Sequence, residues 1–370
     1  MSSKPKRLLT RLDAAIAAAV VDPFAADCLR AERACYLARQ GHQERASVEL
    51  EAIRARYASR PNPSISAWLS LADGLMSHFT DLGVAARDKM RRAHALSAAG
   101  RLLPLHALSS AWLAHMDYTR HDVDSMVRHL SQALLLAQAD HHAARSRANL
   151  VAALAYHLAG RQDLAQPWYA RARTHANAEG DDATISAMLF NMASSRLHNL
   201  RQAVLGFQVS APHEGEHALI GADSTVNFDQ MLGTVSLQSL LSLVRAHILS
   251  LQGEPAQALA LYEAHLDKAQ GMARMRAYML SDQAWCRLQV GQIDAARVDA
   301  MAAEADPCDE TQIDDRAAMH SRLAQVFAGL GNREAAQRHE ALARTAWNDF
   351  RTLQGRIVEL LSGVGANGPL

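Results

Sequence analysis

Aromatic side chains, charge of one sign and long apolar runs are all scarce in this chain of 370 residues. Aromatic residues make up only 5% of it although hydrophobic residues make up 49%, so alanine supplies much of the apolar content. Runs of β-branched residues, which favour strands, are nearly absent, and this argues against a β-sheet. Small apolar side chains instead suit helices that pack closely together. We therefore expect an all-α fold.

The balanced charge and the short apolar runs argue against two classes of partner. Lys and Arg number 38 and Asp and Glu also number 38, so no basic stripe indicates phosphate binding to nucleic acid. No apolar run approaches the roughly 18–20 residues that span a bilayer. We expect neither a nucleic-acid partner nor a membrane partner.

Cysteine is also scarce, and its spacing indicates where the protein works. The chain has four cysteines and none stands in a CxxC motif, which favours reduced thiols. Basic residues precede the apolar stretch Ala14–Val21 as in a signal peptide, but Asp13 interrupts its start and no cleavage site is clear. We therefore expect a cytoplasmic protein.

What the chain does have is a pattern repeated around five glycines, each with Ala seven residues before it and Ala five residues after it. The glycines are Gly41, Gly160, Gly253, Gly291 and Gly331; the alanines are Ala34 and Ala46, Ala153 and Ala165, Ala246 and Ala258, Ala284 and Ala296, and Ala324 and Ala336. Small side chains at fixed places let two helices approach closely, and Gly adopts the left-handed conformation that ends the first helix. The pattern predicts helical hairpins that stack on one another.

The fullest copy of the pattern has Tyr156, Gly160, Ala165, Tyr169 and Ala172. This order resembles the tetratricopeptide repeat (TPR) family. Weaker copies surround Asp81, His121 and Leu200, so the turns recur about every 40 residues, apart from a step of 53 between Leu200 and Gly253. The family norm is about 34 residues. The longer units resemble the TPR domains of bacterial transcriptional regulators and signalling proteins, and HEAT-like repeats are the structural rival. The expected fold is an all-α, TPR-like α-solenoid of about eight helical hairpins.

The predicted hairpins divide the chain into five segments. Residues 1–26 form an N-terminal lead-in helix, and residues 27–208 and 234–345 form TPR-like repeats. Residues 209–233 contain Pro212 and several glycines and are predicted to be a loop insertion. Residues 346–370 are expected to form a capping or connecting helix and a flexible tail.

The terminal helix carries an apolar seam. Ala346, Phe350, Leu353, Ile357 and Leu360 follow one another at intervals of four, three, four and three residues, as in a coiled coil. The seam is either a cap that covers the last hairpin or a contact for a homodimer or a partner protein. The sequence leaves these alternatives open.

One short motif suggests metal chemistry. His213, Glu214 and His217 form HExxH, the pattern in which two histidines bind zinc and the glutamate activates water. Pro212 and Gly215 make this stretch a poor helix, and no phosphate loop or nucleophile motif accompanies it. We expect no enzyme activity, no cofactor and no metal, and a zinc metallopeptidase stays the alternative.

The resemblance to the TPR family implies a concave groove lined by the first helix of each hairpin. Its groove-facing positions lie thirteen, ten, six and three residues before each turn. These positions include Leu108, Leu154, Leu240, Leu243, Ser250 and Ser281. The residues that we predict to bind a partner are Trp68, Leu71, Leu75, His78, His115, Tyr118, Arg147, His157, His247, Tyr278 and Trp285.

This lining is apolar and aromatic, with recurring histidines, and it lacks the Lys/Asn clamp that binds C-terminal carboxylates in chaperone co-factors. An apolar groove suits a peptide whose side chains act as anchors. We therefore expect a non-enzymatic module that binds a protein or peptide in signalling or regulation. A scaffold subunit that dimerises through its C-terminal helix is the second hypothesis. Protonation of the groove histidines near pH 6 would weaken binding.

Overall fold

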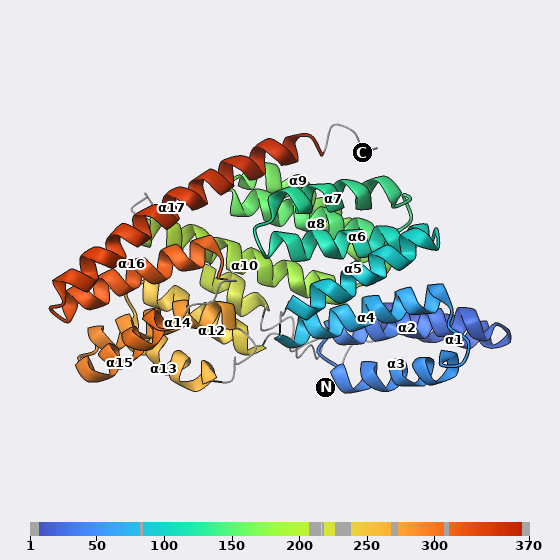
Figure 1. Cartoon of the computed structure of the whole chain (residues 1–370), viewed down its shortest axis with the longest axis horizontal. Coiled ribbons are helices and arrows are strands. Elements are labelled where there is room, and N and C mark those ends of the chain that lie inside the picture. Colours follow the sequence, from blue (N-terminus) through green and yellow to red (C-terminus); the bar gives the residue numbers. More distant parts are fainter. Residues whose placement is uncertain are drawn as a thin grey trace.

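The computed structural model of the chain describes residues 7–81, 84–206, 216, 218–225, 238–267, 273–306 and 311–364. Within these ranges all regular structure is helical, so the predicted all-α class is confirmed (Figure 1). None of the described helices combines the length and apolar character that crossing a bilayer requires.

The described helices follow one another with short connections. They are α1 (Arg7–Ala18), the 3-10 helix η1 (Ala19–Val21), α2 (Pro23–Arg39), α3 (Gln43–Tyr57), α4 (Pro63–Asp81), α5 (Val84–Ala99), α6 (Leu103–Tyr118), α7 (Val123–Leu136), α8 (His142–Leu158), α9 (Gln162–Glu179), α10 (Asp182–Leu205), α12 (Gln238–Leu251), α13 (Pro255–His265), α14 (Ala273–Gln289), α15 (Ile293–Glu304), α16 (Ile313–Gly329) and α17 (Arg333–Ser362).

All five predicted turn glycines end a helix in the left-handed conformation. Their φ angles lie between 72° at Gly160 and 85° at Gly41. His121, at the predicted α6–α7 turn, adopts the same conformation with a φ of 58°. Left-handed backbone costs an ordinary L residue roughly 1–2 kcal/mol, which explains why glycine occupies most of these turns.

Consecutive helices pair as hairpins, and the first helices of successive hairpins also contact one another. α2, α4, α6 and α8 form one such row, and α12, α14 and α16 form a second (Figure 1). The marker alanines of the first four glycine turns are at most 1% exposed, as expected for points of close helix approach. In the last hairpin, Ala324 and Ala336 are only half-buried.

The turn predicted near Leu200 is not formed. α10 runs for 24 residues from Asp182 to Leu205 and passes through this position. The stretch contains no Gly or Pro, so nothing in the local sequence stops the helix, and only the expected 40-residue rhythm suggested a turn there. As Figure 1 shows, α10 lies between the two rows of hairpins.

The predicted loop insertion at 209–233 contains helical structure. Residues 218–225 are helical, and Ala218 and Ala222 are at most 1% exposed within the main core. The side chains of Ser224 and Thr225 bond to backbone carbonyls four residues earlier, which is compatible with a helix. The rest of the segment, including His213, Glu214 and His217, lies outside the described residues.

The helix boundaries also differ from the predicted segments at both ends. α2 starts at Pro23, four residues before the predicted start of the repeats, because Asp22 caps it by accepting from the Ala25 backbone amide. α17 is continuous across residue 345, so the second helix of the last hairpin and the terminal helix are one element.

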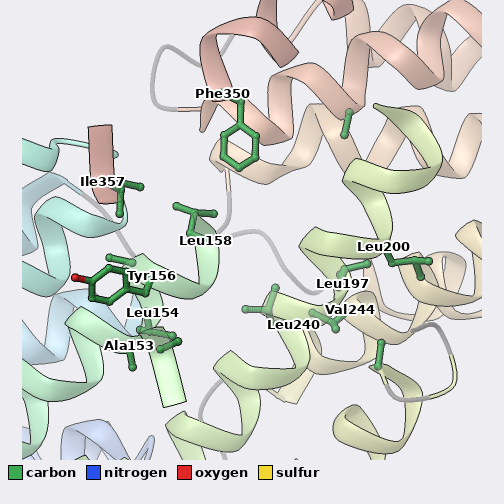
Figure 2. Close-up of a cluster of buried hydrophobic side chains, with 14 of the residues drawn as sticks. Ala153, Leu154, Tyr156, Leu158, Leu197, Leu200, Leu240, Val244, Phe350 and Ile357 are labelled. Atoms are coloured by element: carbon green, nitrogen blue, oxygen red, sulfur yellow. The ribbon is translucent and has the colours of Figure 1, made fainter. Parts of the chain in front are cut away.

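Much of the C-terminal seam is buried within the chain itself. α17 runs from its partner α16 back to α7 and α8 (Figure 1). Ala346, Phe350 and Ile357 are at most 4% exposed, and Gln354 donates to the Leu158 carbonyl at 2.8 Å. Figure 2 shows Phe350 and Ile357 beside Leu158 in this core. These three seam residues therefore pack against the chain's own helices, whereas Leu353 and Leu360 are half-buried.

The N-terminal helix also packs on a distant part of the chain. The Leu8 amide donates to the Gly180 carbonyl at 3.1 Å, and Arg7 pairs with Asp182 at 2.9 Å. Arg39 of α2 pairs with Asp181 at 2.7 Å. These contacts place α1 against the α9–α10 turn, and that turn against α2.

Candidate functional site

Most of the predicted groove residues are buried, because other elements pack on the first helices of the hairpins. α1 and the α9–α10 turn pack on the first row of hairpins through α2, and α10 lies between the two rows (Figure 1). Two cavities lie at these contacts, and we call them the N-terminal cavity and the central cavity. Predicted groove positions line both.

The N-terminal cavity has a volume of about 40 Å³. Its walls come from the first helices of four hairpins, with α1 and the α9–α10 turn across them. Of the predicted positions it contains Trp68, Leu71, Leu75, Leu108 and Arg147. Residues that the prediction missed include Glu32, Tyr36, Arg39, Trp112 and Asp181.

The central cavity is larger, at about 140 Å³, and lies where α6, α8, α10, α12, α14 and α16 meet. It contains the predicted positions Tyr118, Leu154, Leu240, Leu243, His247 and Tyr278. The side chains of Leu197 and Val244 complete an apolar wall, and Figure 2 shows Leu154, Leu197, Leu240 and Val244 in the cluster between the helices.

The polar side of the central cavity is formed by an ion-pair cluster that joins α10 to α16. Arg201, only 2% exposed, pairs with Asp315 at 2.6 Å and also with Asp314. Burial raises the pKa of Asp314, but Arg201 and then His198 outweigh it and hold that pKa below its ordinary value. Arg201 is therefore the main cation that stabilises these two buried carboxylates.

A second buried cluster is centred on Asp282 of α14. His247 Nδ1 lies 2.9 Å from Asp282 Oδ2, the Tyr262 hydroxyl donates to the same oxygen at 2.7 Å, and Arg322 Nε donates to Oδ1 at 2.7 Å. Burial opposes ionisation of Asp282, but His247 and Arg322 hold its pKa well below the usual range. The Asp282 carboxylate already accepts several hydrogen bonds from its neighbours. It therefore joins the surrounding helices and is not free to act as a base.

The remaining predicted residues lie outside both cavities. His78 and His115 pack around Trp112, with ring centroids 6.3 and 5.7 Å from it. His157 contacts the Tyr169 hydroxyl of its own hairpin at 3.2 Å. Trp285 packs under Arg322, whose guanidinium carbon lies 5.2 Å from the ring centroid.

Burial disfavours protonation of two of the predicted groove histidines, His157 and His247. Burial lowers the pKa of His157 to about 4, with smaller contributions from the charges of His198 and Arg196. Burial also lowers the pKa of His247. The expected loss of binding near pH 6 is therefore not supported at these two positions, where the imidazoles stay neutral to lower pH.

A further groove lies away from the predicted positions. A groove of about 530 Å³ between α16 and α17 is floored by Ala324, Ala328, Ala336 and Ala343, beside Trp347. The marker alanines of the last hairpin, Ala324 and Ala336, line this groove and are therefore half-exposed.

In the described part of the chain, no group of three or more His, Cys, Asp or Glu side chains is arranged to hold a metal ion. No model of a known protein family matches the chain, and no curated protein matches its sequence.

Proposed function

We propose that the protein is a non-enzymatic, TPR-like helical-repeat module that binds a peptide or partner protein in signalling or regulation. Six predicted groove positions, from four different helices, line the one central cavity. That convergence is the observation that carries the proposal. Together with the chain's Gly and Ala pattern, it favours a repeat array whose concave side holds a ligand.

The size and walls of the central cavity indicate the kind of anchor it takes. Its volume, about 140 Å³, is close to the roughly 150 Å³ of an engineered apolar cavity that binds benzene. Leucine, valine and tyrosine side chains line much of the cavity together with Asn191, Ser194 and Ser195, and Arg201 and Asp315 are already paired. We infer that the cavity accepts one aromatic or branched aliphatic side chain of a peptide, as an anchor residue does in other interfaces.

Panning a random peptide library against the purified chain tests this proposal. Ser194→Phe places an aromatic ring at the cavity wall, and Ser131→Phe places the same ring on the exposed surface of α7 as the matched control. We expect peptides that share an aromatic or aliphatic anchor to bind the native chain and S131F but not S194F. Circular dichroism checks that both variants keep their helices.

The proposal fails if no peptide is enriched on the native chain, or if S194F retains all the enriched peptides. Light scattering on the native chain addresses the scaffold alternative. Because Ala346, Phe350 and Ile357 of the seam are buried within the chain, we expect the mass of one chain.

A further inference from the structure

Arg147 is a buried cation without an anion. Its side chain is 4% exposed, and among the described residues its guanidinium has no hydrogen bond and no ion pair. Burial, and then the neighbouring charge of Arg39, lower its pKa to about 9. An uncompensated buried charge is costly, so a protein rarely keeps one unless something binds it.

The other charges in the wall of the N-terminal cavity are engaged with one another. Asp181 accepts two contacts from Arg39, at 2.9 and 2.7 Å, and Glu179 pairs with Arg11. Burial and then Glu179 raise the pKa of Glu32 to about 7, so this carboxyl is partly protonated near neutral pH. Arg147 feels the charge of Asp181, but among the described residues it has no ion pair of its own.

The position of Arg147 leaves its donors available. Its guanidinium carbon lies 3.8 Å from the ring centroid of Trp112, which is 2% exposed and therefore held firmly in place. Such stacking uses the flat face of the guanidinium, whereas its N–H groups point outward in the plane. Two parallel N–H groups in one plane match the two oxygens of a carboxylate.

The size and charge of the cavity favour a carboxylate over a phosphate. A volume of about 40 Å³ holds about three water-sized atoms, since one water needs roughly 10–15 Å³ of such space. A carboxylate has three heavy atoms and a single charge, which matches the single unpaired cation. A phosphate is larger and carries up to two charges, and Asp181 and Glu179 would repel the second.

We propose that the N-terminal cavity binds a carboxylate group, with Arg147 stacked on Trp112 as the residue that holds it. The carboxylate belongs either to a small free acid or to a peptide terminus or side chain. This site is separate from the central cavity and does not require that the central cavity bind a peptide.

Sodium acetate is the probe for a direct test on the full chain. We expect acetate to raise the thermal midpoint above that in sodium chloride or sodium phosphate at the same ionic strength, because a ligand that binds only the native state stabilises it. Arg147→Met should abolish this shift and should leave the midpoint without acetate equal to or above that of the native chain. Arg171→Met removes a guanidinium that lies 4.9 Å from the Trp168 ring and is the matched control, which should keep the shift.

The proposal is overturned if R147M keeps the acetate shift, or if chloride and phosphate produce the same shift. If R147M does not fold, the NMR signal of the acetate methyl group provides the test. We expect the native chain to broaden this signal by binding acetate, and we expect Arg147→Lys to weaken the binding at least tenfold. An acetate signal that the native chain leaves sharp also overturns the proposal. Peptides with a free or an amidated C-terminus then distinguish a terminal carboxylate from other sources.

Discussion

Replacing Arg201 with methionine tests how the two rows of hairpins are joined. Arg201 of α10 is 2% exposed and pairs with Asp314 and Asp315 at the start of α16, whose side chains are at most 5% exposed. Methionine keeps much of the apolar stem but leaves two buried carboxylates without their main cation. Removing one partner of a buried ion pair costs about 3–5 kcal/mol. We expect R201M to lower the free energy of unfolding by about this amount at pH 7.

The pH dependence of this loss follows from the pKa of Asp314. In the native chain that pKa lies below its ordinary value of 3.8, so the ion pair stabilises the fold above pH 3.8 and loses this effect as the pH falls toward the native pKa. Without Arg201, burial becomes the dominant influence and raises the native pKa above the unfolded one. The ionised carboxylate then destabilises the fold, and protonation relieves it. R201M should therefore recover part of its deficit as the pH falls from 7 to 4.5.

Urea unfolding followed by circular dichroism at both pH values measures these changes. The triple variant with Arg201→Met, Asp314→Asn and Asp315→Asn is the control, because it removes the anions together with the cation and should recover much of the lost free energy. A deficit below about 1 kcal/mol at pH 7, the typical effect of any substitution, would refute the reasoning. An equal deficit at both pH values would refute the electrostatic cause.

Three further predictions concern the turns, the terminal helix and the buried histidines. Gly253→Ala should cost about 1–2 kcal/mol of unfolding free energy, because φ is +83° there although a Cβ would meet no atom within 4 Å. Gly355 lies inside α17, and a Cβ there would also meet no atom within 4 Å, so Gly355→Ala should stabilise the fold by up to about 1 kcal/mol. Equal urea midpoints for the Gly253→Ala and Gly355→Ala variants would contradict this. Ile357→Ala should cost about 2–5 kcal/mol in the same assay, since its side chain is 2% exposed; a smaller loss would argue against docking of α17. Burial lowers the pKa of His157 and His198 to about 4 from the ordinary 6.5. Between pH 6.5 and 4 only the unfolded chain takes up these protons, so the free energy of unfolding should fall as the pH falls through this range. A free energy of unfolding in urea that does not change with pH would exclude this.

The helical hairpins were predictable because their signals are local. A glycine at φ near 80° and an alanine at a close helix contact are each required by the backbone next to them, as at Gly253 and Ala246. The long helix α10 was missed because its continuity depends only on the absence of Gly and Pro. The prediction gave more weight to the 40-residue spacing of the turns than to this absence.

The groove positions were predicted from the repeat, but their environment was not. Counting back from the turns selected residues such as Leu154 and Leu240, which do line a cavity. The polar residues of that cavity come together from distant parts of the chain, since Arg201 donates hydrogen bonds to residues 113 and 114 positions further along. No periodic pattern encodes such contacts, although an arginine or aspartate within an Ala-rich helix, as at Arg201 or Asp282, is a signal that could have been followed.

The return of α17 to the middle of the chain determines when folding can finish. In a linear repeat array each hairpin contacts only its neighbours, so hairpins can assemble one after another as they are synthesised. Here Arg356 pairs with Asp124 across 232 residues, and Gln354 bonds to Leu158 across 196. These contacts form only after nearly the whole chain has left the ribosome, and closing such long loops is slow. Until that late step, the faces of α7 and α8 that α17 covers stay exposed to solvent.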